Sequence, residues 1–221
     1  MRLSRLAREL LSLVTLASNI FVHSHALCES AEVGSGTRIW AFAHVMKGAV
    51  IGRDCMIGDH AFIESGGRIG DRVTIKNQAM IWNGVEIGDD VFVGPGVTFT
   101  NDLSPRSPRM LLPPIAARYG DRARWLLPTR IECGASLGAR CVILAHVTVG
   151  PYAMVAAGAV VTRDVAAHGL AVGVPARRVG WVCRCGERLT LVVANTWRCP
   201  RCVERFNAEA TGECINPVQS S

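Results

Sequence analysis

Large apolar residues recur at every sixth position along most of this chain. The first run of the series consists of Leu27, Val33, Ile39, Val45, Ile51, Ile57, Ile63, Ile69, Ile75, Ile81, Ile87, Val93 and Phe99. The second run consists of Ile131, Leu137, Ile143, Val149, Val155 and Val161. A period of six fits neither an amphipathic helix nor an alternating strand, and it is typical of a parallel β-helix built from hexapeptides. The sequence therefore predicts an all-β protein in which these residues stack inward from coil to coil.

A second set of residues, four places after each of these anchors, is mostly small. It begins with Ala31, Thr37, Ala43, Ala49, Cys55 and Ala61 and ends with Ala153, Ala159 and Val165. Small side chains allow a short face to turn a corner, and three faces make one coil. We therefore expect four coils over residues 27–98 and two more over residues 131–166.

The six-residue period ends after Phe99, in the segment that contains "TFTND" and "PRS". The segment 102–130 is predicted to be a loop inserted between two coils, and long ordered loops are usually functional. It holds six arginines against two aspartates, which suits a site that binds phosphate groups. The alternative is that these arginines only solvate the loop.

The ends of the chain differ in composition from the repeats. Residues 1–20 carry Arg2, Arg5 and Arg8 among leucines, which predicts a short amphipathic helix. The apolar run there is too short and too interrupted for a membrane span, so we expect a cytoplasmic protein with no membrane insertion. The formal net charge of +6 is mild, and no Lys/Arg cluster is interleaved with aromatic residues, so we expect no nucleic-acid partner.

The segment 181–221 contains two close pairs of cysteines. The pairs are Cys183 with Cys185 in "CRCG" and Cys199 with Cys202 in "CPRC". Four thiolates suit a tetrahedral zinc ion, and four protein ligands make such a site structural. The sequence predicts a small zinc-ribbon-like appendage, although the C-x-C spacing of the first pair is unusual for zinc, and simple reduced thiols are the alternative.

Several segments resemble a known family. The phrase "VGVPARRVG" at 172–180 resembles the exit from the last coil of left-handed parallel β-helix acyltransferases of the hexapeptide family. The words "GTRIWAFAHV", "GDRVTIKNQAMIWNGVEI", "DDVFVGPGVTFTND" and "PRS" are similar to the sugar-nucleotide 3-N-acetyltransferases in that family. The resemblance covers roughly residues 27–180. It implies an acetyltransferase domain over 21–180, a homotrimer with active sites between subunits, and acetyl-CoA as the acetyl donor.

The tail sequence "GWVCRCGERL" narrows the resemblance further. It is similar to members acting on UDP-2-acetamido-3-amino-2,3-dideoxy-glucuronate, so the expected reaction is N-acetylation of the 3-amino group of that sugar nucleotide. A sugar amine is partly neutral at pH 7 and needs no strong base, whereas a hydroxyl acceptor normally requires one.

The resemblance also implies site residues. Asn101 is expected to orient the amine near the thioester, because an amide cannot act as a base; without the resemblance it reads as a turn residue. The expected substrate-binding residues are Asn77, Trp82, Asn83, Asp102 and Arg106. The expected CoA-binding residues are Ala157, Gly158, Ala159, Arg163 and Arg177.

Three other functions remain open at the level of sequence. The substrate could be a dTDP-3-amino-dideoxyhexose. The enzyme could be an O-acetyltransferase that uses His60 or His146 as its base, since both follow an anchor by three places and are expected to point outward. The β-helix could also be a non-catalytic scaffold with a partner-binding tail.

Overall fold

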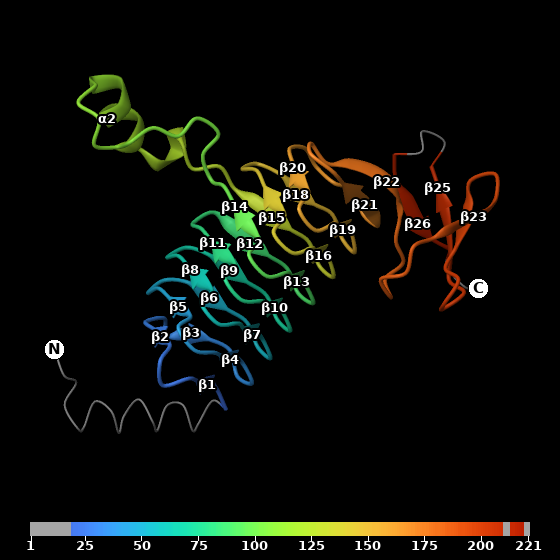
Figure 1. The fold of residues 1–221 in the computed structure, drawn as a ribbon, viewed down its shortest axis with the longest axis horizontal. Coiled ribbons are helices and arrows are strands. Elements are labelled where there is room, and N and C mark those ends of the chain that lie inside the picture. Colours follow the sequence, from blue (N-terminus) through green and yellow to red (C-terminus); the bar gives the residue numbers. More distant parts are fainter. Residues whose placement is uncertain (1–18, 210–212, 219–221) are drawn as a thin grey trace.

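The structure, a computed structural model, describes residues 19–209 and 213–218. These residues form a parallel β-helix, a loop that projects from its flank, and a small antiparallel sheet at its C-terminal end (Figure 1). The predicted all-β architecture with an inserted loop and a C-terminal appendage is confirmed. Of the predicted N-terminal helix at 1–20, residues 1–18 lie outside the described part of the chain.

The β-helix has three faces, each a sheet of short strands. The first face holds β1 (Phe21–Val22), β4 (Arg38–Ile39), β7 (Met56–Ile57), β10 (Thr74–Ile75), β13 (Phe92–Val93), β16 (Ser136–Leu137), β19 (Met154–Val155), β21 (Gly169–Val172) and β22 (Arg177–Trp181). The second face holds β2 (Leu27–Cys28), β5 (His44–Val45), β8 (Phe62–Ile63), β11 (Met80–Ile81), β14 (Thr98–Phe99), β17 (Val142–Ile143) and β20 (Val160–Val161). The third face holds β3 (Glu32–Val33), β6 (Val50–Ile51), β9 (Arg68–Ile69), β12 (Val85–Ile87), β15 (Thr129–Ile131) and β18 (Thr148–Val149).

The register of neighbouring strands explains the six-residue period. Ile39 pairs with Ile57, and Ile57 pairs with Ile75, so each coil takes 18 residues and each face takes six. The second residue of nearly every strand points inward and is buried, because alternate residues of a strand face opposite sides. Each buried Ile or Val contributes about 1.5–3 kcal/mol through the apolar surface it removes from water.

The first coil departs from the predicted register. Leu27 was expected to be a core anchor, but its side chain is 52% exposed. Cys28 takes its place and pairs with Val45, 17 residues later instead of 18. The coil is one residue short at its next corner, where the Ser30 hydroxyl donates to the Ala49 carbonyl at 2.6 Å, and Ala31 is accordingly exposed. The period therefore begins in phase at Val33.

The inserted loop leaves the second face after β14 and returns at β15. Glu86 pairs with Arg130, so the ladder passes the insertion without a break. Since β15 begins at Thr129, the loop ends at residue 128 and the predicted boundary at 130 was two residues late. The loop contains α2 (Pro113–Tyr119), which starts with two prolines as helix N-termini allow, and the 3₁₀ helix η1 (Arg122–Arg124).

The C-terminal appendage is an antiparallel sheet of β23 (Thr190–Val193), β24 (Thr196–Arg198), β25 (Arg205–Ala208) and β26 (Ile215–Pro217). It has a hydrophobic cluster separate from that of the β-helix, made of Trp181, Cys183, Leu189, Cys199, Phe206 and Ile215. The antiparallel pair β21–β22 connects it to the last coil. No helix in residues 19–209 or 213–218 is both long enough and apolar enough to cross a membrane.

Candidate active site

Asn83, Asn101 and His146 lie on one corner of the β-helix, between the second and third faces. They follow β11, β14 and β17, which are consecutive strands of the second face. Phe99 pairs with Ile143, so Asn101 and His146 occupy neighbouring rungs although 45 residues separate them in the sequence. We call this edge the second corner; the first corner lies between the first and second faces.

Backbone and side-chain hydrogen bonds hold Asn101 at the neck of the loop. Its Nδ2 donates to the Asn83 carbonyl at 3.2 Å, and its own carbonyl accepts the Leu127 N–H at 3.0 Å. On the rung below, the Trp82 indole donates to the Phe99 carbonyl at 2.9 Å. In the described part of the chain no hydrogen bond engages Asn101 Oδ1, which leaves this oxygen able to accept one from a ligand.

Asp102, the next residue, anchors the loop to itself. Its carboxylate accepts two hydrogen bonds from the Arg118 guanidinium, at 2.5 and 3.0 Å, and one from the Tyr119 hydroxyl at 2.8 Å. The Ser104 N–H adds a fourth at 2.8 Å. The Asp102 side chain is only 8% exposed. The hydrogen bonds from Arg118 lower the pKa of this carboxyl to about 2, so it is ionised at neutral pH.

This cluster limits how Asp102 can meet a substrate. Both oxygens of the Asp102 carboxylate already accept hydrogen bonds from the loop. Asp102 therefore holds the loop in position next to Asn101. Arg106 is exposed, and its guanidinium donates to the Pro105 carbonyl at 3.0 Å. Arg118 and Tyr119 were not singled out as site residues by the sequence, because only the folded loop brings α2 back onto Asp102.

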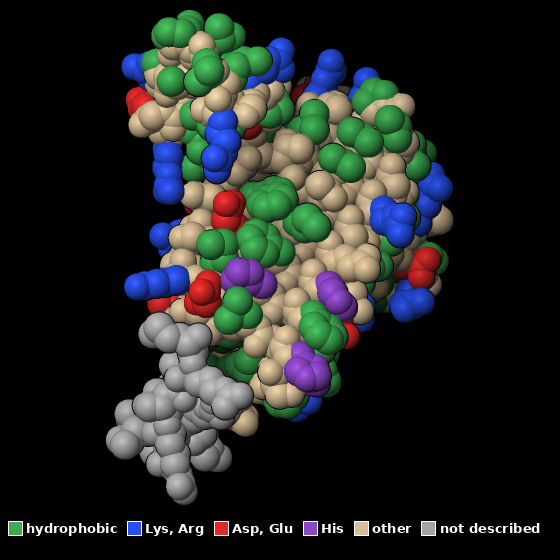
Figure 2. Space-filling view, turned by 60° about the vertical axis from the view of Figure 1, so that its left-hand side comes forward, with side chains coloured by type: hydrophobic (Ala, Val, Ile, Leu, Met, Phe, Trp, Pro, Cys, Tyr) green, Lys and Arg blue, Asp and Glu red, His purple; other side chains and the backbone are tan. Residues whose placement is uncertain are grey.

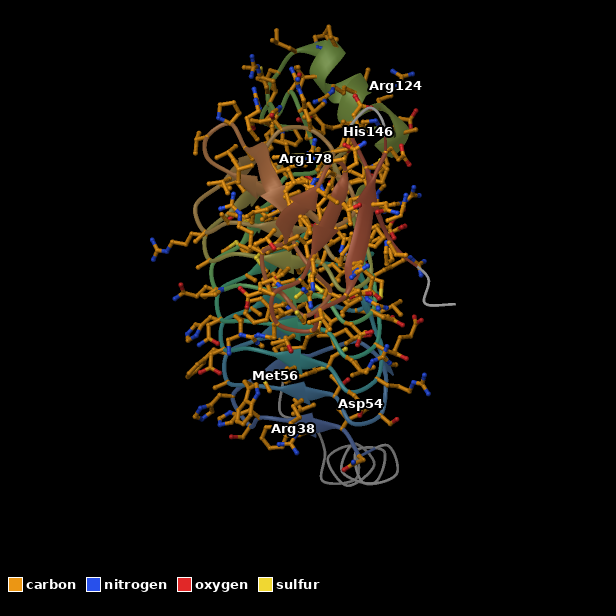
Figure 3. The ribbon with its side chains drawn as sticks, turned by 90° about the vertical axis from the view of Figure 1, so that its right-hand side faces the viewer. Arg38, Asp54, Met56, Arg124, His146 and Arg178 are labelled. Carbon is orange, nitrogen blue, oxygen red and sulfur yellow. The ribbon has the colours of Figure 1, made fainter. Side chains whose placement is uncertain are left out.

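His146 is exposed at its corner, and in the described ranges no hydrogen bond orients its ring. A histidine that acts as a base normally has a partner that fixes its tautomer and direction. Figure 3 places it at the loop-bearing end of the β-helix, near the level of Arg124, while Arg38, Asp54 and Met56 lie toward the opposite end. The geometry therefore gives Asn101 hydrogen bonds that fix its position, whereas His146 has none within the described part of the chain.

The remaining predicted site residues are divided between two corners. Asn77, Ala157 and Gly158 are exposed on the first corner, whereas Arg163 follows β20 on the second. Ala159 is buried in the core, so only its backbone can approach a ligand.

Arg163 and Arg177 lie at one cavity near the C-terminal end of the β-helix. They line a cavity of about 250 Å³ together with Arg178 and Glu213. The carboxylates of Asp164 and Glu213 line the same cavity, so three guanidinium groups leave it with a small positive excess. That excess suits an anionic ligand, because Arg binds phosphate oxygens in a forked geometry.

The surface below the loop is apolar. Figure 2 shows the loop as a lobe standing out from the flank of the β-helix, with hydrophobic side chains and histidines gathered on the flank beneath it. Phe42, at the first corner, and Met80, on the second face, are each at least two-fifths exposed. A face of this kind suits a ligand or a second chain more than free solvent.

Comparison with known proteins agrees with this geometry. Residues 30–65, 66–101 and 128–163 match the family described as bacterial transferase hexapeptide (six repeats). The matched segments stop at Asn101 and resume just before β15, so they flank the loop.

Two curated relatives are similar to the chain. The dTDP-3-amino-3,6-dideoxy-alpha-D-galactopyranose 3-N-acetyltransferase of Aneurinibacillus thermoaerophilus is 46% identical over 172 residues, which are 78% of this chain and 83% of that protein. The bifunctional protein GlmU of Nitratidesulfovibrio vulgaris is 29% identical over 71% of this chain, but the match spans only 34% of its own length. Among solved structures, the acetyltransferase domain of PglB from Neisseria gonorrhoeae, in complex with acetyl coenzyme A, shares the fold with a TM-score of 0.50 at 17% identity. That match covers 79% of this chain and 66% of that one.

The chain belongs to the hexapeptide-repeat transferases. Within that family, the predicted place among the sugar-nucleotide 3-N-acetyltransferases is confirmed by the relative from Aneurinibacillus, and with it the class of enzyme: an acyltransferase that acetylates the amino group of a sugar nucleotide.

Proposed function

We propose that this protein transfers the acetyl group of acetyl-CoA to the 3-amino group of a dTDP-linked 3-amino-3,6-dideoxyhexose. The observation that carries the proposal is the 46% identity to an enzyme named for that reaction, over 83% of its length. The UDP-linked glucuronate expected from the tail sequence has no such support among these relatives. It remains the competing prediction.

The geometry at Asn101 supports chemistry on an amine. The amine nitrogen attacks the thioester carbon, the C–S bond breaks, and the proton of the amine passes to the departing CoA sulfur. Asn101 Oδ1 accepts a hydrogen bond from the amine and so aims its lone pair at the carbonyl carbon. The side chain can do this because its Nδ2 is already held by the Asn83 carbonyl.

The division of the site residues between two corners supports a homotrimer. Asn77 and Asn83 are six residues apart along one face, a span of at most about 20 Å, and the small residues for CoA lie on the same corner as Asn77. A second subunit that presents its first corner to the second corner of its neighbour would bring both sets together. The loop, which projects from the second corner, is placed to cover such a site (Figure 1).

The test is a thiol-release assay with acetyl-CoA and three acceptors. These are a dTDP-3-amino-3,6-dideoxyhexose, the corresponding dTDP-6-deoxyhexose with a 3-hydroxyl, and UDP-2-acetamido-3-amino-2,3-dideoxy-glucuronate. Turnover with the first alone supports the proposal.

The other outcomes each point to a different function. Turnover with the third acceptor alone replaces the dTDP sugar by the UDP sugar and keeps the amine mechanism. Turnover with the hydroxyl sugar supports O-acetylation and a histidine base. No turnover and no binding of CoA would favour a scaffold.

A further inference from the structure

The four cysteines of the appendage converge on one point. Their sulfur atoms all lie within 4.8 Å of one another, with Cys183 and Cys202 at 3.4 Å and Cys185 and Cys199 at 3.5 Å. We propose that these thiolates bind one zinc ion, and that this ion holds the appendage as a cap on the C-terminal end of the β-helix.

The sulfur distances fit a shared metal and not a pair of disulfides. A disulfide joins its sulfurs at about 2.05 Å. Four sulfurs at about 2.3 Å from a central zinc ion in a tetrahedron lie about 3.8 Å from each other. The spacings of 3.4 and 3.5 Å are close to this second value, and all four sulfurs lie within 4.8 Å of one another.

The backbone around both pairs forms the tight turns that present two thiolates to one ion. In the first turn, the Gly186 N–H donates to the Cys183 carbonyl at 2.9 Å, and the Cys183 N–H donates to the backbone carbonyl of Glu187 at 2.8 Å. In the second, Cys202 N–H donates to the Cys199 sulfur at 3.4 Å. Hydrogen bonds from backbone N–H groups to sulfur stabilise the thiolate form, which is the form that binds metal. Despite the short C-x-C spacing of the first pair, both of its sulfurs lie within 4.8 Å of those of the second pair, which is compatible with one shared ion.

The appendage also needs a source of stability beyond its core. Its hydrophobic cluster has six buried residues, two of which are the cysteines Cys183 and Cys199. A unit of about forty residues with so small a core usually depends on a metal or on disulfides. Zinc would add cohesion at the centre of the unit, where the two turns meet.

Zinc at this place would act on the β-helix through Trp181, Val182 and Phe206. The Val182 N–H donates to the His168 carbonyl at 2.8 Å, and the His168 ring donates from Nδ1 to the Val182 carbonyl at 2.9 Å. The same ring packs between Tyr152 of the last coils and Phe206 of the appendage, with centroids at 5.3 and 5.1 Å. Trp181 and Phe206 belong to the cysteine cluster's own core, so the ion and the last coil share one packed unit.

The cap reaches the arginine-lined cavity as well. Arg178 lies over the Trp181 ring at 3.9 Å, and Glu213 of the appendage lines the cavity with Arg163 and Arg177. If the proposed function holds and this cavity receives part of CoA, loss of the ion raises the KM for acetyl-CoA more than it lowers kcat. This expected change in KM rests on the proposed function, whereas the proposal of a metal site does not depend on it.

The first experiment measures metal in the full chain, purified under reducing conditions without added zinc chelators. Elemental analysis is expected to find about one zinc per chain. Cys202→Ser, whose side chain is exposed, is expected to reduce the zinc content at least about tenfold. The matched control is Cys214→Ser, an exposed cysteine of the same tail outside the cluster, which is expected to keep a full zinc content.

A second measurement does not depend on the folding of a variant. A mercurial reagent added to the wild-type chain should release about one equivalent of zinc to a chromogenic chelator. Replacement by Co²⁺ should give the visible absorption of tetrahedral thiolate coordination.

Four results would overturn the proposal: no zinc in the wild type even after refolding with zinc, iron in place of zinc, a mass lower by the hydrogens of two disulfides, or full zinc in Cys202→Ser. All of these are read without turnover, so they remain informative whether or not the proposed reaction is found.

Discussion

At the scale of single residues, the site depends on which groups are held and which are free. Asn101 is tied to the Asn83 carbonyl and to the loop neck, while among residues 19–209 and 213–218 no hydrogen bond orients the ring of His146, one rung away. A group that orients a nucleophile must itself be fixed, because misplacement of a reacting atom by about 1 Å can cost about a hundredfold in rate.

Asn101→Ala is therefore expected to lower kcat for the amino-sugar acceptor by about a hundredfold, with little change in the melting temperature. His146→Ala should change kcat by less than about threefold, because an amine acceptor does not need a strong base. Steady-state kinetics on both variants, beside circular dichroism, make the comparison. A large loss in His146→Ala with Asn101→Ala near wild type would contradict the amine-orienting role.

Asp102 is the second residue whose environment allows a prediction. Asp102→Asn removes the charge that binds Arg118, and breaking charge-assisted hydrogen bonds of this kind costs about 1.5–3 kcal/mol. The loop should become sensitive to proteases between residues 103 and 127. Tyr119→Phe removes a single neutral donor and should have a smaller effect in the same limited proteolysis.

The pH dependence of this loop follows from the same carboxyl. Its pKa is lowered to about 2 in the folded loop from an ordinary value near 3.8, so its contribution to stability is complete above about pH 4 and is lost as the pH falls through about 2. Pepsin digestion between those values should leave the wild-type loop intact at pH 4 and cut it near pH 2, whereas Asp102→Asn should be cut throughout. Equal resistance of both proteins to pepsin at pH 4 would mean that the hydrogen bonds between Asp102 and Arg118 do not hold the loop in place.

At the scale of elements, the corners of the β-helix restrict which residues fit as strongly as its core does. A Cβ added at Gly138 would lie 2.4 Å from the Ala157 backbone nitrogen on the next coil. A Cβ at Gly158 meets nothing within 4 Å, and the residue is constrained only by its φ of +68°. The two positions follow each other along one corner, so they form a matched pair.

Gly138→Ala is expected to destabilise the fold by about 1–3 kcal/mol, since rigid backbone must move to relieve the overlap. Gly158→Ala should cost about 1 kcal/mol, the strain of an L-residue at positive φ. Urea titrations followed by circular dichroism should show the larger shift in midpoint for Gly138→Ala. The reverse order would mean that the coils are not packed as described.

At the scale of the whole molecule, the proposed trimer makes the active site a property of the assembly. Sedimentation should give a mass of three times the 23.8 kDa of one chain. A stronger test mixes two inactive variants, Asn101→Ala on the second corner and Ala157→Trp on the first.

Random mixed trimers should recover about a quarter of the sites, because a head-to-tail interface pairs the intact corner of one chain with the intact corner of another. No recovery, from variants that still form trimers, would place the whole site within one chain.

The sequence alone determined the fold and the position of the loop. Anchors at every sixth residue place one anchor on each of three faces, so that Ile39, Ile57 and Ile75 stack on one face at intervals of 18 residues. The break after Phe99 was visible for the same reason. Local pattern is sufficient here because every coil repeats the same contacts with its neighbours.

Only the tertiary structure decided the register of the first coil and the partners within the site. One missing residue before Val33 moved Leu27 to the surface, and a six-residue count cannot detect a shift in the first coil, which has no earlier repeat to fix its phase. The pairing of Asp102 with Arg118, and the placement of Asn101 on the rung next to His146, depend on a loop that leaves the second face after β14 and rejoins the β-helix at β15. Such contacts join residues that are distant in sequence through the path of the chain in space, and no periodicity encodes that path.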